Sequence, residues 1–168
     1  MKTVSALIAL ALGAGLAGSA MAADTIVQFS RGIGVDPVAG IDSGTGMPVI
    51  NTVRNVPPGG RPWVIRKLRA SFYADGSVMV RGAGLLFSGG DNIGTTGPIT
   101  QVKATLFCGQ PGQAVGYDSA LGDLDARGDF TIKGQMLQAP ANPCVKPVLL
   151  IRNAAGAWFA AGIVGDED

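Results

Sequence analysis

The sequence contains no histidine, and its single glutamate, Glu167, is next to the last residue. Without histidine the chain lacks the commonest general acid–base side chain and the base of a Ser-His-Asp triad or Cys-His pair. Histidine ligands for a metal ion are excluded for the same reason. Acid–base catalysis would have to rest on aspartates, so the composition favours a protein that is not an enzyme and that holds no cofactor.

Charge of either sign is also scarce. Charged residues make up 15% of the chain, with 13 basic against 12 acidic side chains. Without Lys2, which belongs to the N-terminal segment described next, the two signs balance at 12 each. Bulk charge therefore gives no reason to expect nucleic acid or an acidic membrane surface as a partner.

Long apolar runs are missing except at the N-terminus. Lys2 supplies a positive start, Val4–Leu16 is apolar and uncharged, and Ala20-Met21-Ala22 is a small-x-small cleavage site. This pattern predicts a secretory signal peptide over residues 1–22, cleaved near Ala22/Ala23. The run is too short and too glycine-rich for a membrane span, and no later segment is a better candidate. The short, alanine-rich leader is typical of bacteria, so we expect a secreted or periplasmic protein.

Cysteine is limited to Cys108 and Cys144. In an exported protein an even pair of cysteines indicates a disulfide bond. The bond would close a loop of about 37 residues, which the chain-entropy model values at roughly 3–4 kcal/mol. A redox role would need a nearby resolving cysteine or an activating histidine, and the sequence has neither. We therefore expect a structural disulfide.

Residues 23–168 show no sustained helical period. They contain short β-rich segments at fairly even spacing, separated by turns of Gly, Pro, Asn and Asp. This pattern predicts a single all-β domain, an antiparallel β-sandwich, with a small β-barrel as the alternative. The expected strands are Thr25–Phe29, Val49–Val56, Trp63–Tyr73, Ser77–Phe87, Ile99–Cys108, Ala114–Tyr117, Asp129–Lys133, Cys144–Arg152 and Ala157–Val164. The segment Arg31–Pro48 has no clear period, and we expect a functional loop or a partly ordered arm there.

The clearest structural signal is the hairpin between Trp63 and Phe87. A three-residue loop at Ala74–Gly76 puts glycine at the last position, where a G1 bulge needs a left-handed backbone. The resulting register predicts one apolar face, on which Phe72 faces Val78, Ala70 faces Val80 and Leu68 faces Gly82. It also sets Arg69 directly opposite Arg81 on the other face. Trp63 and Ile65 are out of phase with Leu68, which predicts a bulge near Arg66-Lys67.

The hairpin also contains the only concentration of positive charge. Arg66, Lys67, Arg69 and Arg81 form the candidate binding residues, with Arg61 just upstream. One interpretation is a solvated strand face without a ligand. The other is a surface that binds a small anionic or polar ligand, or an unknown protein partner. The Arg69–Arg81 pair is unfavourable unless the side chains splay apart or share an anion.

Asp123, Asp125 and Asp129 are the candidate metal ligands, because they stand at alternating positions around Gly128 as in a calcium loop. The match fails at two positions. Arg127 occupies the third ligand position, and Gly134 stands where the bidentate glutamate belongs. Aspartate and glycine are also ordinary turn residues, so we expect no metal site here.

Three functions remain open from the sequence. The favoured hypothesis is an exported, non-enzymatic β-domain that binds a ligand or a surface. The first alternative is a secreted hydrolase that depends on aspartates alone. The second is a structural envelope protein that forms homo-oligomers by pairing sheet edges. The signal peptide, the disulfide and the missing catalytic side chains favour the first.

Overall fold

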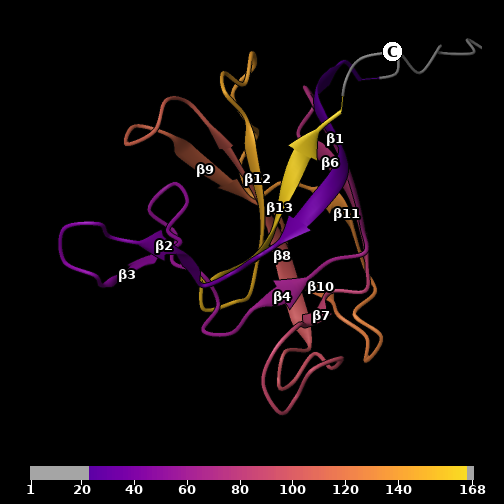
Figure 1. The fold of residues 1–168 in the computed structure, drawn as a ribbon. Helices are drawn as coiled ribbons and strands as arrows, with labels where there is room; N and C mark the ends of the chain where they lie inside the picture. The colour runs from indigo at the N-terminus through magenta and orange to yellow at the C-terminus, as the bar shows by residue number, and fades with distance from the viewer. Residues whose placement is uncertain (1–22, 166–168) are drawn as a thin grey trace, which may run out of the picture.

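The computed structural model describes residues 23–165, and in this part of the chain it contains strands and turns but no helix (Figure 1). The predicted signal peptide lies outside the described residues. The all-β prediction is confirmed. The strands are β1 (Thr25–Gly34), β2 (Val38–Ile41), β3 (Pro48–Ile50), β4 (Trp63–Val64), β5 (Lys67–Tyr73), β6 (Ser77–Ala83), β7 (Leu86–Phe87), β8 (Gln101–Cys108), β9 (Val115–Asp118), β10 (Gly122–Asp123), β11 (Phe130–Gln135), β12 (Val148–Arg152) and β13 (Trp158–Val164).

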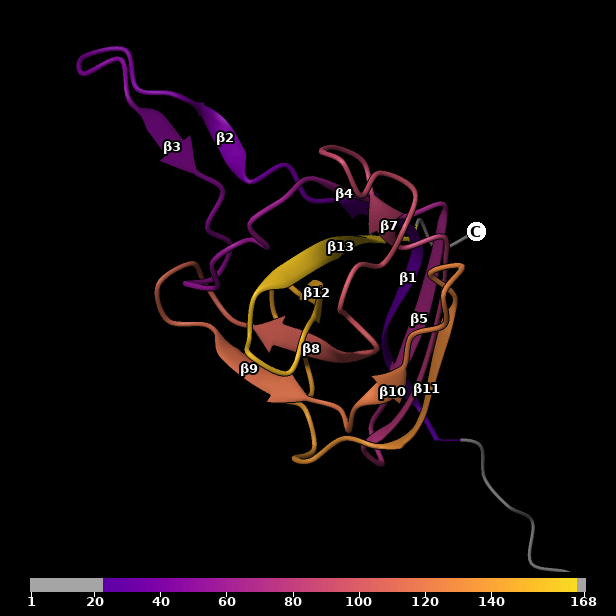
Figure 2. The ribbon, with the colours of Figure 1, turned by 90° about the horizontal axis from the view of Figure 1, so that it is seen from below.

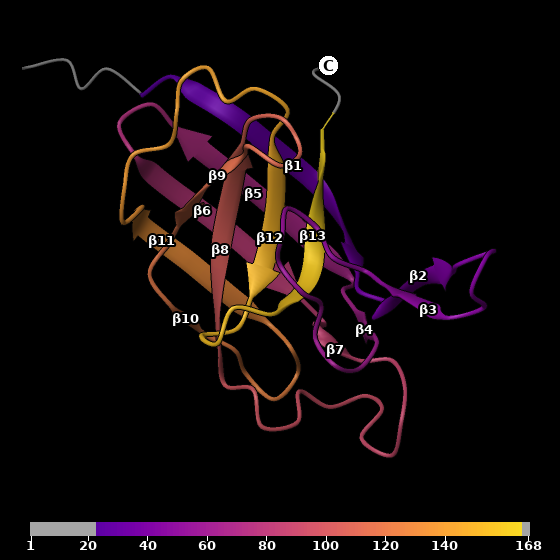
Figure 3. The same cartoon turned by 90° about the vertical axis from the view of Figure 1, so that its left-hand side faces the viewer.

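The main sheet is antiparallel and curls over the core. Its strand order is β10-β8-β12-β13-β1-β5-β6-β11, and β9 pairs with the same edge of β8 as β10, opposite to β12. Figure 2 shows this curl, which brings β10 next to β11, and Figure 3 shows β5, β6 and β11 crossing behind β8, β12 and β13. The sheet is thus a half-barrel whose two halves face each other as the layers of a sandwich do. The pairs β2–β3 and β4–β7 form separate small sheets.

The central hairpin has the register that the sequence predicts. Arg69 pairs with Arg81, Ala70 with Val80 and Phe72 with Val78. Gly76 closes the turn with a φ of +80°, the left-handed conformation that glycine adopts without a steric penalty. Local turn chemistry and the two-residue alternation of side chains were therefore enough to fix this register.

The predicted irregularity before the hairpin is also present. Arg66 and Lys67 are both exposed in succession, whereas Trp63 and Leu68 on either side are buried. The chain bends at Arg66, and β4 pairs with β7 rather than extending β5. This break places Trp63 over the core despite its phase.

The prediction of a long loop at Arg31–Pro48 is wrong in part. Strand β1 continues to Gly34, because β13 pairs with it from Phe29 to Gly34, whereas β5 pairs only with Thr25–Phe29. The chain then forms the hairpin β2–β3, whose residues are all exposed. This hairpin projects from the body of the molecule (Figure 2). The strand predicted at Val49–Val56 is correspondingly short, since β3 ends at Ile50.

The disulfide bond between Cys108 and Cys144 is confirmed. It links the end of β8 to the segment that precedes β12. The strand predicted from Cys144 begins only at Val148, directly after Pro147, which has no N–H to donate to a ladder. The bond therefore ties a loop, rather than a strand, to the sheet.

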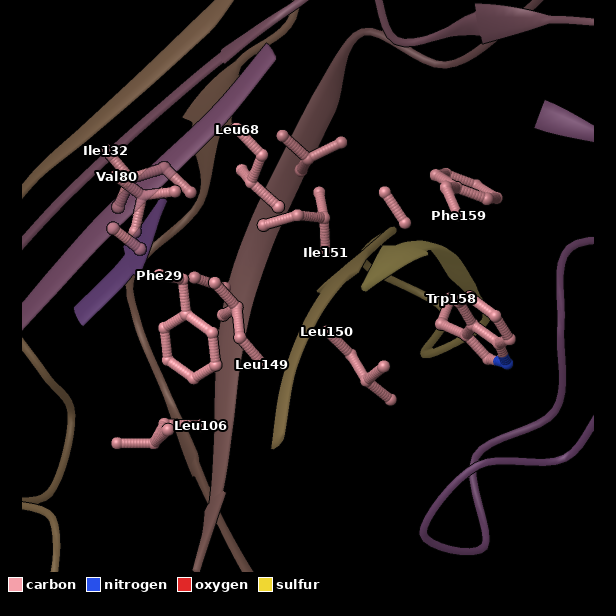
Figure 4. Packing of buried hydrophobic residues seen from close by; sticks show 14 of the residues in the cluster. Phe29, Leu68, Val80, Leu106, Ile132, Leu149, Leu150, Ile151, Trp158 and Phe159 are labelled. Atoms are coloured by element: carbon pink, nitrogen blue, oxygen red, sulfur yellow. The ribbon is translucent and has the colours of Figure 1, made fainter. Parts of the chain in front are cut away.

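The core fills the space inside the curled sheet. Phe29 and Phe72 meet edge to face with ring centroids 6.1 Å apart, and Leu68, Leu106 and Leu149 lie beside them without exposure (Figure 4). Phe130 and Ile132 of β11 point inward, as predicted. Among the residues that the structure describes, no helix has the length and apolar character needed to cross a membrane.

Candidate functional site

The predicted basic residues of the hairpin lie on the outer face of the main sheet. Lys67, Arg69 and Arg81 are exposed, and they alternate along β5 and β6 with the buried Leu68, Ala70, Val80 and Gly82. This alternation follows from the strand geometry, which sends successive side chains to opposite faces. The inner neighbours anchor the strands in the core, so the cations are held on a rigid sheet rather than a mobile loop.

Arg69 and Arg81 stand directly opposite each other on adjacent antiparallel strands. Directly paired residues of such strands have Cβ atoms about 4.5–5.5 Å apart. No carboxylate among residues 23–165 lies within 4.0 Å of either guanidinium, whereas other arginines of this region have acidic partners. The pair is therefore a concentration of positive charge without a salt bridge in the described part of the chain, although Asp123 and Asp129 line a groove together with Arg81.

Two flanking strands enlarge this surface. β11 pairs with β6 and places Thr131 next to Arg81 and Lys133 two positions further along. β1 pairs with β5 and has a bulge between Phe29 and Arg31, which leaves Ser30 and Arg31 exposed together. Sequence reasoning missed these residues, because pairing between distant strands leaves no signal in the local pattern. We call Arg31, Lys67, Arg69, Arg81 and Lys133 the cationic face.

A groove of about 630 Å³ runs over this face, with Arg31, Lys67, Arg69 and Arg81 among its lining residues. The hydroxyl group of Ser30 lies at its β1 side. Guanidinium and ammonium groups are donors without acceptor capacity, and a hydroxyl can also donate. The groove thus offers hydrogen-bond donors and positive charge to an anionic group.

Arg66, the fourth predicted binding residue, differs from the other three because it has an acidic neighbour. It lies at the bend between β4 and β5, and its Nη2 is 3.9 Å from Oδ1 of Asp129. The Asp129 carboxylate also accepts a hydrogen bond from the backbone N–H of Gly84. Arg66 therefore lines the end of the groove but is partly neutralised there.

The candidate metal ligands are engaged in hydrogen bonds within the fold, and those of Asp125 form the turn. Oδ1 of Asp125 accepts hydrogen bonds from the backbone N–H groups of Arg127 and Asp129, both at 2.9 Å. The bond from Asp129, followed by those from Arg127, outweighs the opposing effect of burial and holds the pKa of Asp125 below its usual value. Asp123 accepts a bond from the side chain of Gln101 at 3.2 Å. Within residues 23–165, no three His, Cys, Asp or Glu residues are grouped as a metal centre would need.

A second charged cluster lies between β8, β9 and β12. Oδ2 of Asp118 is 2.6 Å from Nζ of Lys103, and its Oδ1 accepts a 2.6 Å bond from the hydroxyl of Thr105. Arg152 lies 3.7 Å from the same carboxylate and donates to Thr105. Burial alone would raise the pKa of Asp118, but the hydrogen bonds and the two cations outweigh it and lower the pKa. All these groups are paired with one another, which is typical of a structural network.

The chain was compared with family models, curated proteins and solved structures, and none of them matches. The functional argument therefore rests on the geometry of this molecule.

Proposed function

We propose that the protein is an exported, non-enzymatic binding domain whose cationic face holds anionic groups of its partner. The observation that carries the proposal is the Arg69–Arg81 pair, which stands on a rigid sheet with no carboxylate within 4.0 Å among the described residues. Export is inferred from the leader sequence, and the disulfide bond suits an oxidising compartment. The ligand class is phosphate, sulfate or carboxylate groups displayed on a soluble or polymeric partner.

The physical reason is that two like charges directly opposite each other raise the free energy of the folded protein when nothing lies between them. An anion bound between Arg69 and Arg81 replaces that repulsion with two attractive, charge-assisted contacts. The planar guanidinium group also matches the oxygen spacing of phosphate, sulfate and carboxylate. Lys67, Arg31 and Lys133 extend the positive charge along the strands, which suits a partner with several anionic groups.

The hydrolase alternative has less support. A general acid at neutral pH needs a raised pKa, and the pKa of Asp125 and that of Asp118 are both lowered. Asp125 and Asp129 also bond to backbone N–H groups, which commits their carboxylates to the local fold. These contacts favour structural roles for both aspartates.

The proposal is tested by titrating the protein, without its leader, with dextran sulfate and with neutral dextran of the same length. We expect saturable binding of dextran sulfate only. The variant R69S/R81S should bind at least about tenfold more weakly, because it loses two charge-assisted contacts. Each contact contributes about 1.5–3 kcal/mol when shielded from water and less when exposed to solvent. Binding should also weaken as the salt concentration rises.

A matched control removes the same amount of charge elsewhere. Arg127 and Lys146 are exposed and lie outside the cationic face, so R127S/K146N changes the net charge equally. This control should bind dextran sulfate nearly as well as the unaltered protein. Equal losses in both double variants would mean that only bulk charge matters, and this result would refute the proposed face.

A second candidate function, assembly with further copies of the chain, is favoured by the β2–β3 hairpin. Its apolar side chains are unusually open, with Ile41 63%, Met47 64% and Ile50 57% exposed. The hairpin carries Asp36 and Asp42 and no basic residue, so its charge complements the cationic face of a second copy. Sedimentation at rising protein concentration would test this, with I41S/I50S as the variant that should stay monomeric. A monomeric mass at all concentrations for the unaltered protein would rule this function out.

A further inference from the structure

A separate cavity of about 400 Å³ lies where three loops meet, and it shares no residue with the groove on the cationic face. The turn at Gly59–Arg61, the loop that contains Asn92 and Pro98, and the segment 153–159 form its walls. Its volume is within the range of about 300–1,000 Å³ that is typical of small-molecule sites. The cavity is therefore large enough to hold a small molecule.

Three aromatic rings form the floor of the cavity. Trp63 lies between Phe87, at a centroid distance of 4.2 Å, and Phe159, at 4.3 Å and nearly parallel. Gly59 packs directly against this stack, since a Cβ atom at this position would lie 2.7 Å from Phe159 and 3.2 Å from Nε1 of Trp63. The missing side chain lets the backbone of the Gly59–Arg61 turn close over the rings, and the cavity beside it is lined by Phe87 and Phe159, which suits a flat, apolar group.

Trp63 and Asn153 each offer a hydrogen-bond donor beside this floor. Trp63 is only 3% exposed, and its indole N–H has no hydrogen-bond partner among residues 23–165, whereas the indole of Trp158 donates to the carbonyl of Asn51. Asn153 uses its side-chain oxygen to accept from the backbone N–H of Ala157 at 2.9 Å, which leaves its NH₂ group to donate. These donors suit a guest that accepts hydrogen bonds.

Arg61 adds a positive charge to the cavity, which favours an anionic guest. Its guanidinium lies 5.5 Å from the ring centroid of Phe87, in a cation–π contact that holds it at the rim. Within the described part of the chain, no carboxylate lies within 4.0 Å of it, in contrast to Arg127 and Arg152. A neutral guest would cover this cation without compensating it, and a cationic guest would be repelled.

We propose that this cavity binds small organic carboxylates with a flat, apolar body, such as arylalkanoic acids. The apolar body lies against Phe87 and Phe159, which line the cavity, and the carboxylate meets Arg61 at the rim. The unpaired donors of Trp63 and Asn153 orient the polar end of the guest. This site shares no residue with the groove on the cationic face, so the two proposals can be tested separately.

The test uses 3-phenylpropionate as the probe and 3-phenylpropanamide as its uncharged counterpart. Tryptophan fluorescence reports binding, because Trp63 lines the cavity and the only other tryptophan, Trp158, does not. We expect a saturable fluorescence change with the acid and binding at least about tenfold weaker with the amide, in keeping with the loss of one charged hydrogen-bond contact. Absence of a saturable change with the acid overturns the proposal, and so does equal binding of acid and amide.

Variants locate the probe. R61Q should weaken 3-phenylpropionate binding at least about tenfold, and R61K should weaken it less, because lysine keeps the charge without the planar group. Arg61 is exposed, so both proteins should keep the circular dichroism spectrum of the unaltered chain. R127Q, which changes an exposed arginine outside the cavity, should bind normally. Unchanged binding in R61Q overturns the proposal. Loss of binding in R69S/R81S would place the probe on the cationic face and would overturn it too.

Discussion

The opposed arginines of the central hairpin lead to a prediction that couples stability to ligand binding. Replacing Arg69 by glutamate should stabilise the folded protein and at the same time weaken binding of an anionic polymer. Arg69 faces Arg81 across the strands and lies on the same face of β5 as Lys67, so a carboxylate here would have these two cations beside it. Arg81 is a poorer choice, since Asp123 and Asp129 line the surface next to it.

The size of the effect follows from the separation of the charges. Two unit charges about 6 Å apart in water interact by about 0.7 kcal/mol, which screening at physiological salt reduces to about 0.3 kcal/mol. R69E changes this repulsion from Arg81 into an attraction of similar size, a total gain of about 0.7 kcal/mol in the free energy of unfolding. The gain should rise to about 1.1 kcal/mol at 10 mM salt and fall to about 0.2 kcal/mol at 1 M.

Urea unfolding followed by circular dichroism, with the disulfide intact, measures these differences. R69Q removes the repulsion without adding attraction, so its free energy of unfolding should lie midway between those of the unaltered protein and R69E. R69E/R81E restores a like-charge pair and should lose the gain, which isolates the pairwise interaction. The reasoning fails if R69E is less stable than the unaltered protein at low salt, or if its advantage does not depend on salt. Dextran sulfate binding should fall in R69E in the same samples.

Three further predictions concern the rest of the fold. Replacing Cys108 and Cys144 together by alanine should cost about 3–4 kcal/mol in the chain-entropy model, measured by urea unfolding; a loss below about 1 kcal/mol would show that the loop they close is restrained by other contacts. The pKa of Asp118 is lower in the folded protein than its value near 3.8 in the unfolded chain. Its contribution to stability is therefore fully present above pH 3.8 and is lost as the pH falls through the pKa of the folded state. The free energy of unfolding should therefore fall less steeply with decreasing pH in D118N than in the unaltered protein. Identical pH profiles of the two proteins would exclude the effect. G82A should cost about 1–3 kcal/mol, because the new Cβ would lie 2.1 Å from Phe130, and hydrogen exchange should speed up in β11 first.

The central hairpin could be predicted because its determinants are local. Gly76 supplies the left-handed turn, and the alternation from Leu68 to Phe72 permits only one register that buries the apolar side chains. The disulfide could be predicted because only two cysteines are present. The opposed arginines followed from the same register, so the centre of the candidate site was visible in the sequence.

The extent of the site could not be predicted in this way. Arg31 and Lys133 join the cationic face because β1 and β11 pair with the two sides of the hairpin. Those pairings link segments about 40–50 residues apart, and their choice depends on how the whole sheet closes over the core. The error at Arg31–Pro48 has the same origin, since β1 extends to Gly34 only because β13 supplies a partner.

By itself, the sequence determined the all-β class, the hairpin register, the disulfide and the missing histidine chemistry. These follow from composition and from interactions between near neighbours in the chain. Only the tertiary structure decided that five cations share one face and that Trp63, Arg61 and Asn153 surround one cavity. The physical reason is that strand pairing and loop packing bring distant residues together to bury the core, and no local pattern records which of them will meet.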